Sequence, residues 1–243
     1  MRGTNRLIFL LLAATLGLAA CTPARVTKNI NDPFELDNRE THEANKRLDR
    51  TLLKPVSHLY GKATSNSMSD GVDNFASNLA LPGMIVNDLL QLNLPDATSN
   101  TFRFALNTTF GLGGLFDVAG KNKIPEKSTD FGETLYTWGV PEGRYLELPI
   151  TGPSTERATA GMIVDTFLDP INRLVPAPQK YVATAAYVMK KVGERDKFGA
   201  MVESILYDSA DSYAQARLMY LQARRHKLTG GISLDQLEDP YAN

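Results

Sequence analysis

The segment Phe102-Arg103-Phe104-Ala105-Leu106-Asn107-Thr108-Thr109-Phe110-Gly111-Leu112-Gly113-Gly114-Leu115-Phe116 combines the two patterns that decide the fold. Its first half, up to Phe110, repeats apolar residues at the spacing of one helix face. Its second half is a glycine-rich turn. The turn begins like a dinucleotide-binding loop, but no strand precedes it and Phe116 occupies the place of the last glycine. We therefore interpret Gly111, Gly113 and Gly114 as a hinge or a close contact between helices.

The stretch before this helix, residues 84–94, is apolar around most of its circumference. Such a helix is too apolar to be surrounded by water, and it is too short to cross a bilayer, which takes about 20 residues. Two environments fit it: a protein core, or the interfacial layer of a membrane. Its composition alone favours the core, whereas a lipid anchor elsewhere in the chain would favour the interface.

Helical patterns extend over most of the remaining chain, and only residues 142–150 look extended. In the first of these helices, one face is formed by Leu48, Leu52, Val56 and Leu59. We therefore predict an all-α fold with little or no strand. We expect a first helix that begins at Asp32-Pro33 and is kinked or broken at Pro55, and a second helix over residues 66–81 that ends at a break at Pro82-Gly83. A short helix is expected after a cap at Ser128 or Thr129, and another over residues 155–168 after a cap at Ser154. The last two expected helices span residues 179–193 and 195–227, and Gly230-Gly231 ends the second of them.

The N-terminus has the pattern of an export signal. Two arginines precede an apolar run from Leu7 to Ala20, which is short for a permanent membrane span. The run ends in Leu18-Ala19-Ala20-Cys21, which resembles the lipobox of bacterial lipoproteins, and Cys21 is the only cysteine of the chain. We predict that residues 1–20 are cleaved, that Cys21 is acylated, that 21–31 are a tether, that 32–230 form the helical domain, and that 231–243 are a polar tail.

Composition excludes several classes of function. The formal net charge is -1, which gives no case for general nucleic-acid binding. With 1 Cys and 3 His in 243 residues, disulfides and cysteine-rich or all-histidine metal sites are not expected. No Gly-x-Ser-x-Gly nucleophile motif is present. We therefore expect no catalytic residues, no metal, no cofactor and no enzymatic activity.

The remaining charged residues have ordinary interpretations. His42 lies in a charged helical segment and is expected at the solvated surface, and Asp208 and Asp211 are expected to face water. The basic run 224–227 has two interpretations. It complements the dipole at a helix C-terminus, or it contacts anionic lipid or an acidic partner.

A series of short motifs runs in order along nearly the whole mature chain. They are Asn31-Asp32-Pro33-Phe34-Glu35 with Asn38-Arg39, Leu53-Lys54-Pro55-Val56 with Tyr60, Asn78-Leu79 with Pro82, Asn87-Asp88-Leu89-Leu90-Gln91, Arg103-Phe104, Asn107-Thr108-Thr109, Gly111 to Ala119, Asp130 to Leu135, Trp138-Gly139-Val140, Leu148-Pro149, Gly152-Pro153-Ser154, Tyr213, and Tyr220 to Arg224. In this order they resemble the MlaA/VacJ family of outer-membrane phospholipid-transport lipoproteins. The chain departs from the family pattern at Asp37, His42 and Ala44, where the family often has aromatic residues.

The resemblance implies a ring-like helical body in the periplasmic leaflet of the cell outer membrane, anchored through Cys21 on the periplasmic side. Phospholipid that has strayed into the outer leaflet would pass through a polar channel to a soluble, MlaC-like periplasmic carrier, which maintains lipid asymmetry. A porin trimer is a further expected partner. The alternative is a non-catalytic scaffold lipoprotein that holds a porin or another envelope component.

Within this picture we assign expected roles to individual residues. Gly111, Gly113 and Gly114 would let a loop bend at the channel mouth. Three asparagines, Asn78, Asn87 and Asn107, could line the channel or could equally make helix caps and interhelical hydrogen bonds. The residues expected to face the membrane are Met84, Ile85, Leu89, Leu90, Phe102 and Phe110.

Overall fold

The computed structural model describes residues 29–171, 175, 176, 178 and 180–229. The predicted signal peptide, the predicted acylation site Cys21, most of the predicted tether and the predicted polar tail lie outside these residues. The helices are α2 (Glu35–Leu48), α3 (Lys54–Ala63), α4 (Asn66–Leu90), α5 (Leu94–Thr109), α6 (Val118–Lys121), α7 (Phe131–Thr137), α8 (Glu156–Leu168), α10 (Lys180–Lys197), α11 (Gly199–Glu203) and α12 (Ser212–Thr229), with π-helical turns η1 (Asp49–Leu53) and η2 (Ser204–Asp208) and strands β1 (Tyr145–Leu148) and β2 (Gly152–Thr155).

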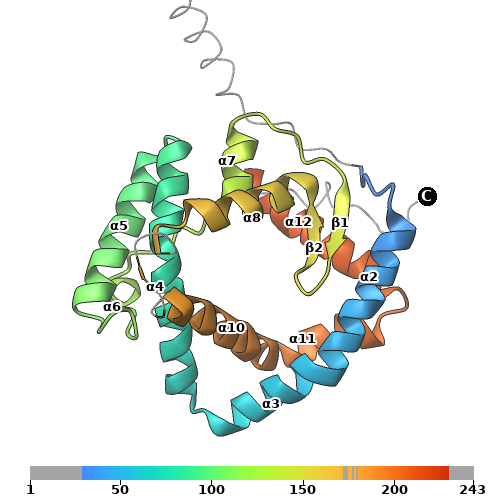
Figure 1. Cartoon of the computed structure of the whole chain (residues 1–243), viewed down its shortest axis with the longest axis horizontal. Coiled ribbons are helices and arrows are strands. Elements are labelled where there is room, and N and C mark those ends of the chain that lie inside the picture. Colours follow the sequence, from blue (N-terminus) through green and yellow to red (C-terminus); the bar gives the residue numbers. More distant parts are fainter. Residues whose placement is uncertain (1–28, 172–174, 177, 179, 230–243) are drawn as a thin grey trace, which may run out of the picture.

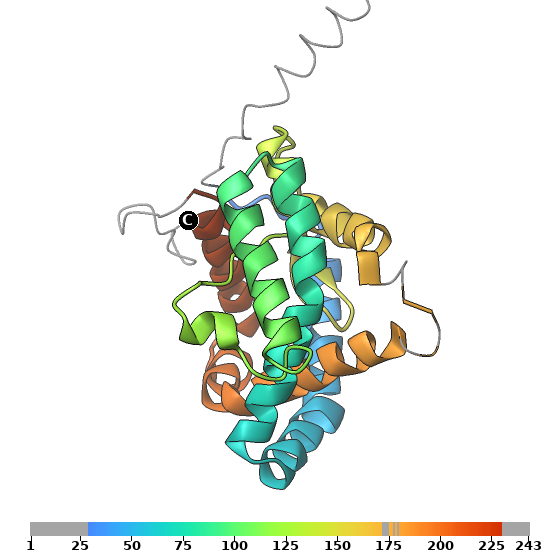
Figure 2. The same cartoon turned by 90° about the vertical axis from the view of Figure 1, so that its left-hand side faces the viewer.

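The elements are arranged in a ring (Figure 1). Contacts between neighbours close it in the order α3, α10, α4, α8, β2, β1, α2 and η1, which leads back to α3. The edge-on view shows α4 and α5 as a pair of long helices on one side (Figure 2). The predicted ring-like, almost entirely helical fold is confirmed, with a single two-stranded sheet in the described part of the chain.

The first helix begins later than predicted. Asp32 does not cap it, because α2 starts at Glu35 and has no side-chain cap. The Asp32 carboxylate instead accepts hydrogen bonds from Asn38, Tyr213 and Arg217, and so ties the chain before α2 to α12. The hydrogen bond between this carboxylate and the Arg217 guanidinium is charge-assisted, and such bonds are about twice as strong as those between neutral groups.

The expected kink at Pro55 takes the form of a π turn. The path from α2 to α3 stays helical, and η1 widens it just before Pro55, which lies in the first turn of α3. Proline is tolerated there because the first N–H groups of a helix have no partner within it.

The predicted break at Pro82-Gly83 is wrong, since α4 continues through Pro82 from Asn66 to Leu90. Proline removes one hydrogen bond of the helix at a cost of about 3 kcal/mol. Here α4 packs against α5 along one side and against α10 along another, and this burial offsets the loss.

The predicted single helix 195–227 is also wrong. Its pattern is divided into the end of α10, then α11, η2 and α12. The last break follows from Asp211, whose carboxylate accepts from the Ala214 N–H at 3.0 Å and so starts α12 anew. Asp211 also binds Arg39, so the expectation that it faces water as a free carboxylate is wrong.

Two predicted caps lie one or two residues from the observed ones. Asp130, not Ser128 or Thr129, accepts from Glu133 N–H and caps α7. Thr155, not Ser154, caps α8. Residues 152–155 form β2 instead of a turn, pairing antiparallel with β1 so that Tyr145 lies opposite Thr155.

Much of what the ring buries is polar. The buried apolar residues are few and many are alanines, and Tyr145, Tyr213 and Leu221 form one small cluster. Buried asparagine, aspartate and arginine side chains fill other contacts between elements, and nearly all of them have hydrogen-bond partners. In the described ranges, none of the helices is long and apolar enough to cross a membrane.

Candidate functional site

A row of apolar side chains on α2, η1 and α3 is exposed. The predicted face of Leu48, Leu52, Val56 and Leu59 exists, but these side chains are 36%, 56%, 41% and 66% exposed and do not form a core. Leu36, earlier on α2, is exposed as well. We call Leu48, Leu52, Val56 and Leu59 the α3 row. Contiguous apolar surface of this kind is typical of a contact with a partner or a membrane.

A second group of exposed apolar side chains surrounds the pair α4 and α5. Of the six residues predicted to face a membrane, Leu89, Leu90, Phe102 and Phe110 are exposed, whereas Met84 and Ile85 are half-buried. The structure adds exposed neighbours that the sequence pattern did not single out, namely Leu92, Leu94, Leu112, Leu115 and Phe116. Leu94 is the first residue of α5, and the other four lie in the turns that follow α4 and α5, where no helical period marks them.

A cavity of about 430 Å³ lies where α4, α8 and α10 meet. Met84 and Asn87 of α4, Met162 and Asp165 of α8, and Tyr187 of α10 contribute to its wall. The wall combines thioether and aromatic groups with a carboxylate and an amide. Burial raises the pKa of Asp165, although hydrogen bonds from Phe131 N–H and Asn87 counteract it.

The three asparagines that could line a channel all make buried hydrogen bonds between elements. Asn78 donates to Thr108 at 3.0 Å and to the Gly113 carbonyl, joining α4 to the end of α5. Asn87 donates to Asp165 at 2.8 Å and accepts from Thr134 at 2.9 Å. The expected interhelical hydrogen bonds are thus observed, Asn87 in addition borders the cavity at α8, and the lining of a channel stays a prediction.

Asn107 organises the turn after α5. It donates to Asp117 at 3.0 Å and accepts from the Ala119 N–H at 2.8 Å. Asp117 also receives a hydrogen bond from Arg103. Burial would raise the pKa of Asp117, but hydrogen bonds from Gly120 N–H, Asn107 and Arg103 outweigh it and hold the pKa below its usual value.

The three glycines of this turn differ in their surroundings. A Cβ at Gly111 would lie 2.3 Å from the Phe116 carbonyl oxygen, and one at Gly114 would lie 2.4 Å from the Asn78 side chain. Gly113 has open space but a φ of +74°, in the left-handed region that favours glycine. Two of the three positions are thus close contacts, and the channel-mouth hinge stays a prediction.

His42 is buried, so the predicted surface position is wrong. Its Nδ1 lies 3.2 Å from Glu147 of β1 and its Nε2 lies 3.1 Å from Ser212 of α12. Tyr145 also donates to Glu147. The charged neighbours of His42 in the sequence point to other sides of α2. The imidazole is buried because the fold places β1 and α12 against it, and these elements are far away in the sequence.

Two asparagines fasten α2 to the edge of β1. Asn38 accepts from the Glu147 N–H and donates to the Tyr145 carbonyl, and Asn45 accepts from the Ile150 N–H and donates to the Leu148 carbonyl. Their amides therefore satisfy strand groups that would otherwise lack partners. The spacing of seven residues places both on one helix face, which was the available signal for Asn45.

The basic run 224–227 is largely engaged inside the protein. Arg224 binds both oxygens of Asp130 at 2.7 Å, and Arg225 binds Glu142 at 2.8 Å and 3.2 Å. Lys227 pairs with Glu133. Neither a dipole effect nor a lipid contact is the main role of the two arginines, which join α12 to α7 and to the loop before β1.

A polar cavity of about 590 Å³ lies beside this cluster, between the end of α4, the start of α5, α7 and the end of α12. Asp88 borders it and is 1% exposed, with Asn100 donating to it at 2.8 Å. Burial, helped by the charges of Asp96 and Glu133, raises the pKa of Asp88 to about 6 against the hydrogen bond from Asn100. Within the described residues, no cluster of three His, Cys, Asp or Glu side chains suits a metal ion.

Comparisons with known proteins agree with this architecture. The sequence profile of the family described as MlaA lipoprotein matches residues 30–227. A protein of Rickettsia bellii described as uncharacterized is 34% identical over 197 residues, covering 81% of this chain and 76% of its own. The Haemophilus influenzae protein named intermembrane phospholipid transport system lipoprotein MlaA is 30% identical over 241 residues, covering 96% of this chain and 95% of its own.

A solved structure from work on the structural basis for maintenance of bacterial outer membrane lipid asymmetry superimposes with a TM-score of 0.71 at 29% sequence identity. The match covers 81% of this chain and 98% of the solved one. Sequence profile, relatives over nearly the full length and the ring of helices agree, and this chain belongs to the MlaA lipoprotein family.

Proposed function

We propose that this protein takes part in phospholipid transport between the two membranes of the bacterial envelope and so maintains the lipid asymmetry of the outer membrane. The relatives that carry this function in their names support the proposal over nearly the whole chain. The observation that carries it is the exposure of large apolar side chains on helices of the ring, both in the α3 row and around α4 and α5.

The arrangement suits a body that lies in one leaflet. Helices satisfy their own backbone hydrogen bonds, so they can contact lipid tails without loss. Exposed leucine and phenylalanine side chains each gain about 1.5–3 kcal/mol when they leave water for an apolar environment. Acylation at Cys21 would hold the body at the outer membrane on its periplasmic side, and the exposed apolar groups would set its depth.

The transport step itself needs no covalent chemistry. The barrier to moving a phospholipid is the burial of its charged headgroup in hydrocarbon, which costs several kcal/mol or more. A ring with lipid-facing apolar groups and polar groups inside its structure lowers this barrier by giving the headgroup hydrogen-bonding partners. The cavity between α4, α8 and α10, with Asn87 and Asp165 beside Met84 and Met162, is the candidate for part of this path. The lipid would then pass to a soluble periplasmic carrier, and a porin trimer would be the neighbour in the membrane.

The test is the amount of phospholipid in the outer leaflet of cells that lack this protein, complemented with the wild type or with Cys21→Ala. We expect the deletion to raise surface phospholipid, measured with an externally added phospholipase or amine-reactive label, and only the wild type to restore it. Unchanged surface phospholipid after deletion would rule out transport and favour the scaffold alternative. Release of fatty acid or headgroup by the purified protein would contradict a conduit without catalysis.

A further inference from the structure

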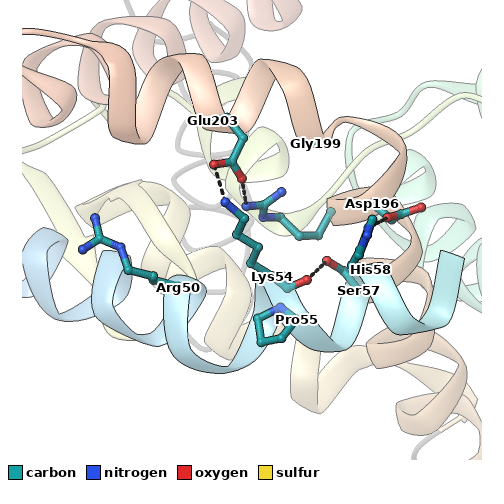
Figure 3. Close-up of a pocket in the computed structure, with 9 residues that line it drawn as sticks. Arg50, Lys54, Pro55, Ser57, His58, Asp196, Gly199 and Glu203 are labelled. Atoms are coloured by element: carbon teal, nitrogen blue, oxygen red, sulfur yellow. Dashed lines mark hydrogen bonds and ion pairs between the residues drawn. The ribbon is translucent and has the colours of Figure 1, made fainter. Parts of the chain in front are cut away.

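A third cavity lies away from the two described above, between α3 and the segment from the end of α10 through α11 (Figure 3). Its volume is about 510 Å³. One wall is formed by η1 and α3, with Arg50, Lys54 and His58, and the other by Arg195, Asp196 and Glu203. Three side chains able to carry positive charge thus follow each other at four-residue intervals along one wall.

Two cations of the cavity walls, Arg195 and Lys54, are already paired with carboxylates. Arg195 donates to both oxygens of Asp49 at 2.7 and 2.9 Å, and to Glu203 at 2.7 Å. Lys54 donates to the other oxygen of Glu203, also at 2.7 Å. These contacts fix the back of the cavity and leave it close to electrical neutrality. His58 lies 3.7 Å from Asp196, which accounts for the remaining carboxylate of the wall.

Arg50 is different, because no carboxylate of the described part of the chain pairs with its guanidinium. Its Cζ lies 4.9 Å from the centre of the Tyr207 ring, and Lys54 approaches the same ring at 5.6 Å. The Tyr207 hydroxyl donates to Asp49 at 2.7 Å, which holds the ring in place. Stacking on a fixed aromatic ring orients a guanidinium and leaves the N–H groups at its edge free to donate. Figure 3 shows Arg50 at one end of the cavity without a bonded partner among the residues drawn.

The chemistry of this wall favours an anion with an apolar part. A planar guanidinium with free donors matches two oxygens of a phosphate better than an ammonium does. Pro55 and the methylene chain of Lys54 give the cavity an apolar floor beside these donors. We propose that this cavity binds a phosphate group, with Arg50 as its principal donor, and that the group belongs to a phospholipid headgroup. The identity of the ligand as a lipid rests on the proposed function, whereas the phosphate site rests on the geometry alone.

The experiment uses the full-length acylated protein in a mild detergent at low salt. It is titrated separately with dihexanoylphosphatidylglycerol, with inorganic phosphate, and with dihexanoylglycerol, which has the same acyl chains but no phosphate. The variants are Arg50→Ala, Arg50→Lys and the matched control Arg47→Ala, which removes an exposed cation of α2 outside this cavity. Circular dichroism and thermal unfolding verify that each variant is folded.

Loss of a charge-assisted hydrogen bond to a phosphate weakens binding by about tenfold or more. We expect that loss for dihexanoylphosphatidylglycerol with Arg50→Ala, a smaller one with Arg50→Lys, and less than about twofold with Arg47→Ala. Binding of dihexanoylglycerol should not depend on Arg50. If only inorganic phosphate depends on Arg50, the phosphate site stands and its ligand is the free anion.

An affinity that is the same in Arg50→Ala and wild type for both phosphate ligands would overturn the proposal. An equal loss in Arg47→Ala would also overturn it, since it would reduce the effect to general charge. The proposed function fails separately: surface phospholipid that does not change on deletion would remove the transport role while leaving Arg50-dependent phosphate binding intact.

Discussion

Arg195 of α10 donates to both carboxylate oxygens of Asp49, at 2.7 and 2.9 Å, and so joins α10 to the π turn between α2 and α3. Both side chains are buried, at 7% and 8% exposure. Burial alone would raise the pKa of Asp49, but hydrogen bonds from Arg195 and Tyr207 outweigh it and lower that pKa. The contact adds a tie between α10 and η1, one of the two π-helical turns in the described part of the chain.

We predict that Arg195→Met destabilises the fold by roughly 3–5 kcal/mol, because it leaves the Asp49 charge buried and unpaired. The control is Lys191→Met, which removes an exposed lysine paired with Glu194 and should cost no more than about 1 kcal/mol. Urea unfolding in detergent measures both. Since the pKa of Asp49 is lowered in the folded state, its contribution is present at neutral pH and is lost as the pH falls below about 4. Equal midpoints for the two variants would contradict the prediction.

Asp88 should have the opposite pH dependence. Its pKa is raised to about 6 by burial, so the folded state holds a proton that the unfolded state releases near pH 4. Stability therefore falls as the pH rises from about 4 to 6. We predict that Asp88→Asn, which keeps an acceptor for Asn100, is more stable than wild type by roughly 1–3 kcal/mol at pH 7.5 and similar to it at pH 4.

The control for Asp88 is Asp96→Asn, a change at a partly exposed carboxylate of the same cavity. Thermal unfolding is followed at both pH values for the three proteins. The idea fails if the pH profile of Asp88→Asn coincides with that of the wild type, or if Asp96→Asn shows the same gain.

His42 and His58 form a matched pair on neighbouring helical segments. His42→Ala removes a partner of buried Glu147 and leaves a cavity between α2, β1 and α12, so we expect a loss of roughly 2–4 kcal/mol. His58 has a side chain that is 66% exposed, and His58→Ala should change stability by about 0.5 kcal/mol or less. Chemical unfolding of both variants tests this difference. Small and equal losses of stability in the two variants would contradict the burial of His42.

The glycine turn gives a graded prediction. Gly114→Ala places a Cβ 2.4 Å from Asn78 at a φ of +103°, so it disturbs both the backbone and the hydrogen bonds of Asn78 to Thr108 and Gly113. Gly113→Ala meets nothing within 4 Å and should cost only the strain of its positive φ, about 1–2 kcal/mol. Thermal unfolding should therefore order the proteins as wild type, Gly113→Ala and Gly114→Ala. The reverse order would show that the turn is looser than its geometry indicates.

The hinge hypothesis has a separate test at the same turn. Gly113→Val keeps the open space around the Cβ but restricts the backbone. If the turn bends at a channel mouth, this variant should raise surface phospholipid in cells while the protein remains folded. Unchanged lipid asymmetry would count against a hinge at Gly113.

Sequence patterns predicted which segments are helical, because apolar spacing and caps are local properties. They misplaced the breaks between helices. Pro82 lies inside α4 because α4 packs against α5 and α10. The 195–227 pattern is interrupted at Asp211, whose carboxylate binds Arg39 and also caps the N-terminus of α12. Such outcomes depend on contacts with other elements, 172 residues apart in the case of Arg39 and Asp211, which a short window of sequence does not contain.

The candidate site was predictable in part for the same reason. The α3 row was visible as one helix face, but its exposure was not, because the same period describes a core face and a lipid-facing one. The burial of His42 depends on β1 and α12, and that of Arg224 on α7. Charged and polar residues are usually expected at the surface, but in this protein many of them form the contacts between elements.

The α3 row provides the most direct test of how the body meets the membrane. Leu52→Glu and Leu59→Glu place charges at positions that are 56% and 66% exposed, so the fold should tolerate them in detergent. In a bilayer the same charges oppose burial by a few kcal/mol each. We expect the double variant to reach the outer membrane if Cys21 is acylated as predicted, yet to leave surface phospholipid high. Leu81→Glu, at a position 1% exposed, should instead unfold the protein in any solvent. Full restoration of asymmetry by the double variant would show that the α3 row does not contact lipid, and the seating of the ring would then rest on α4 and α5 alone.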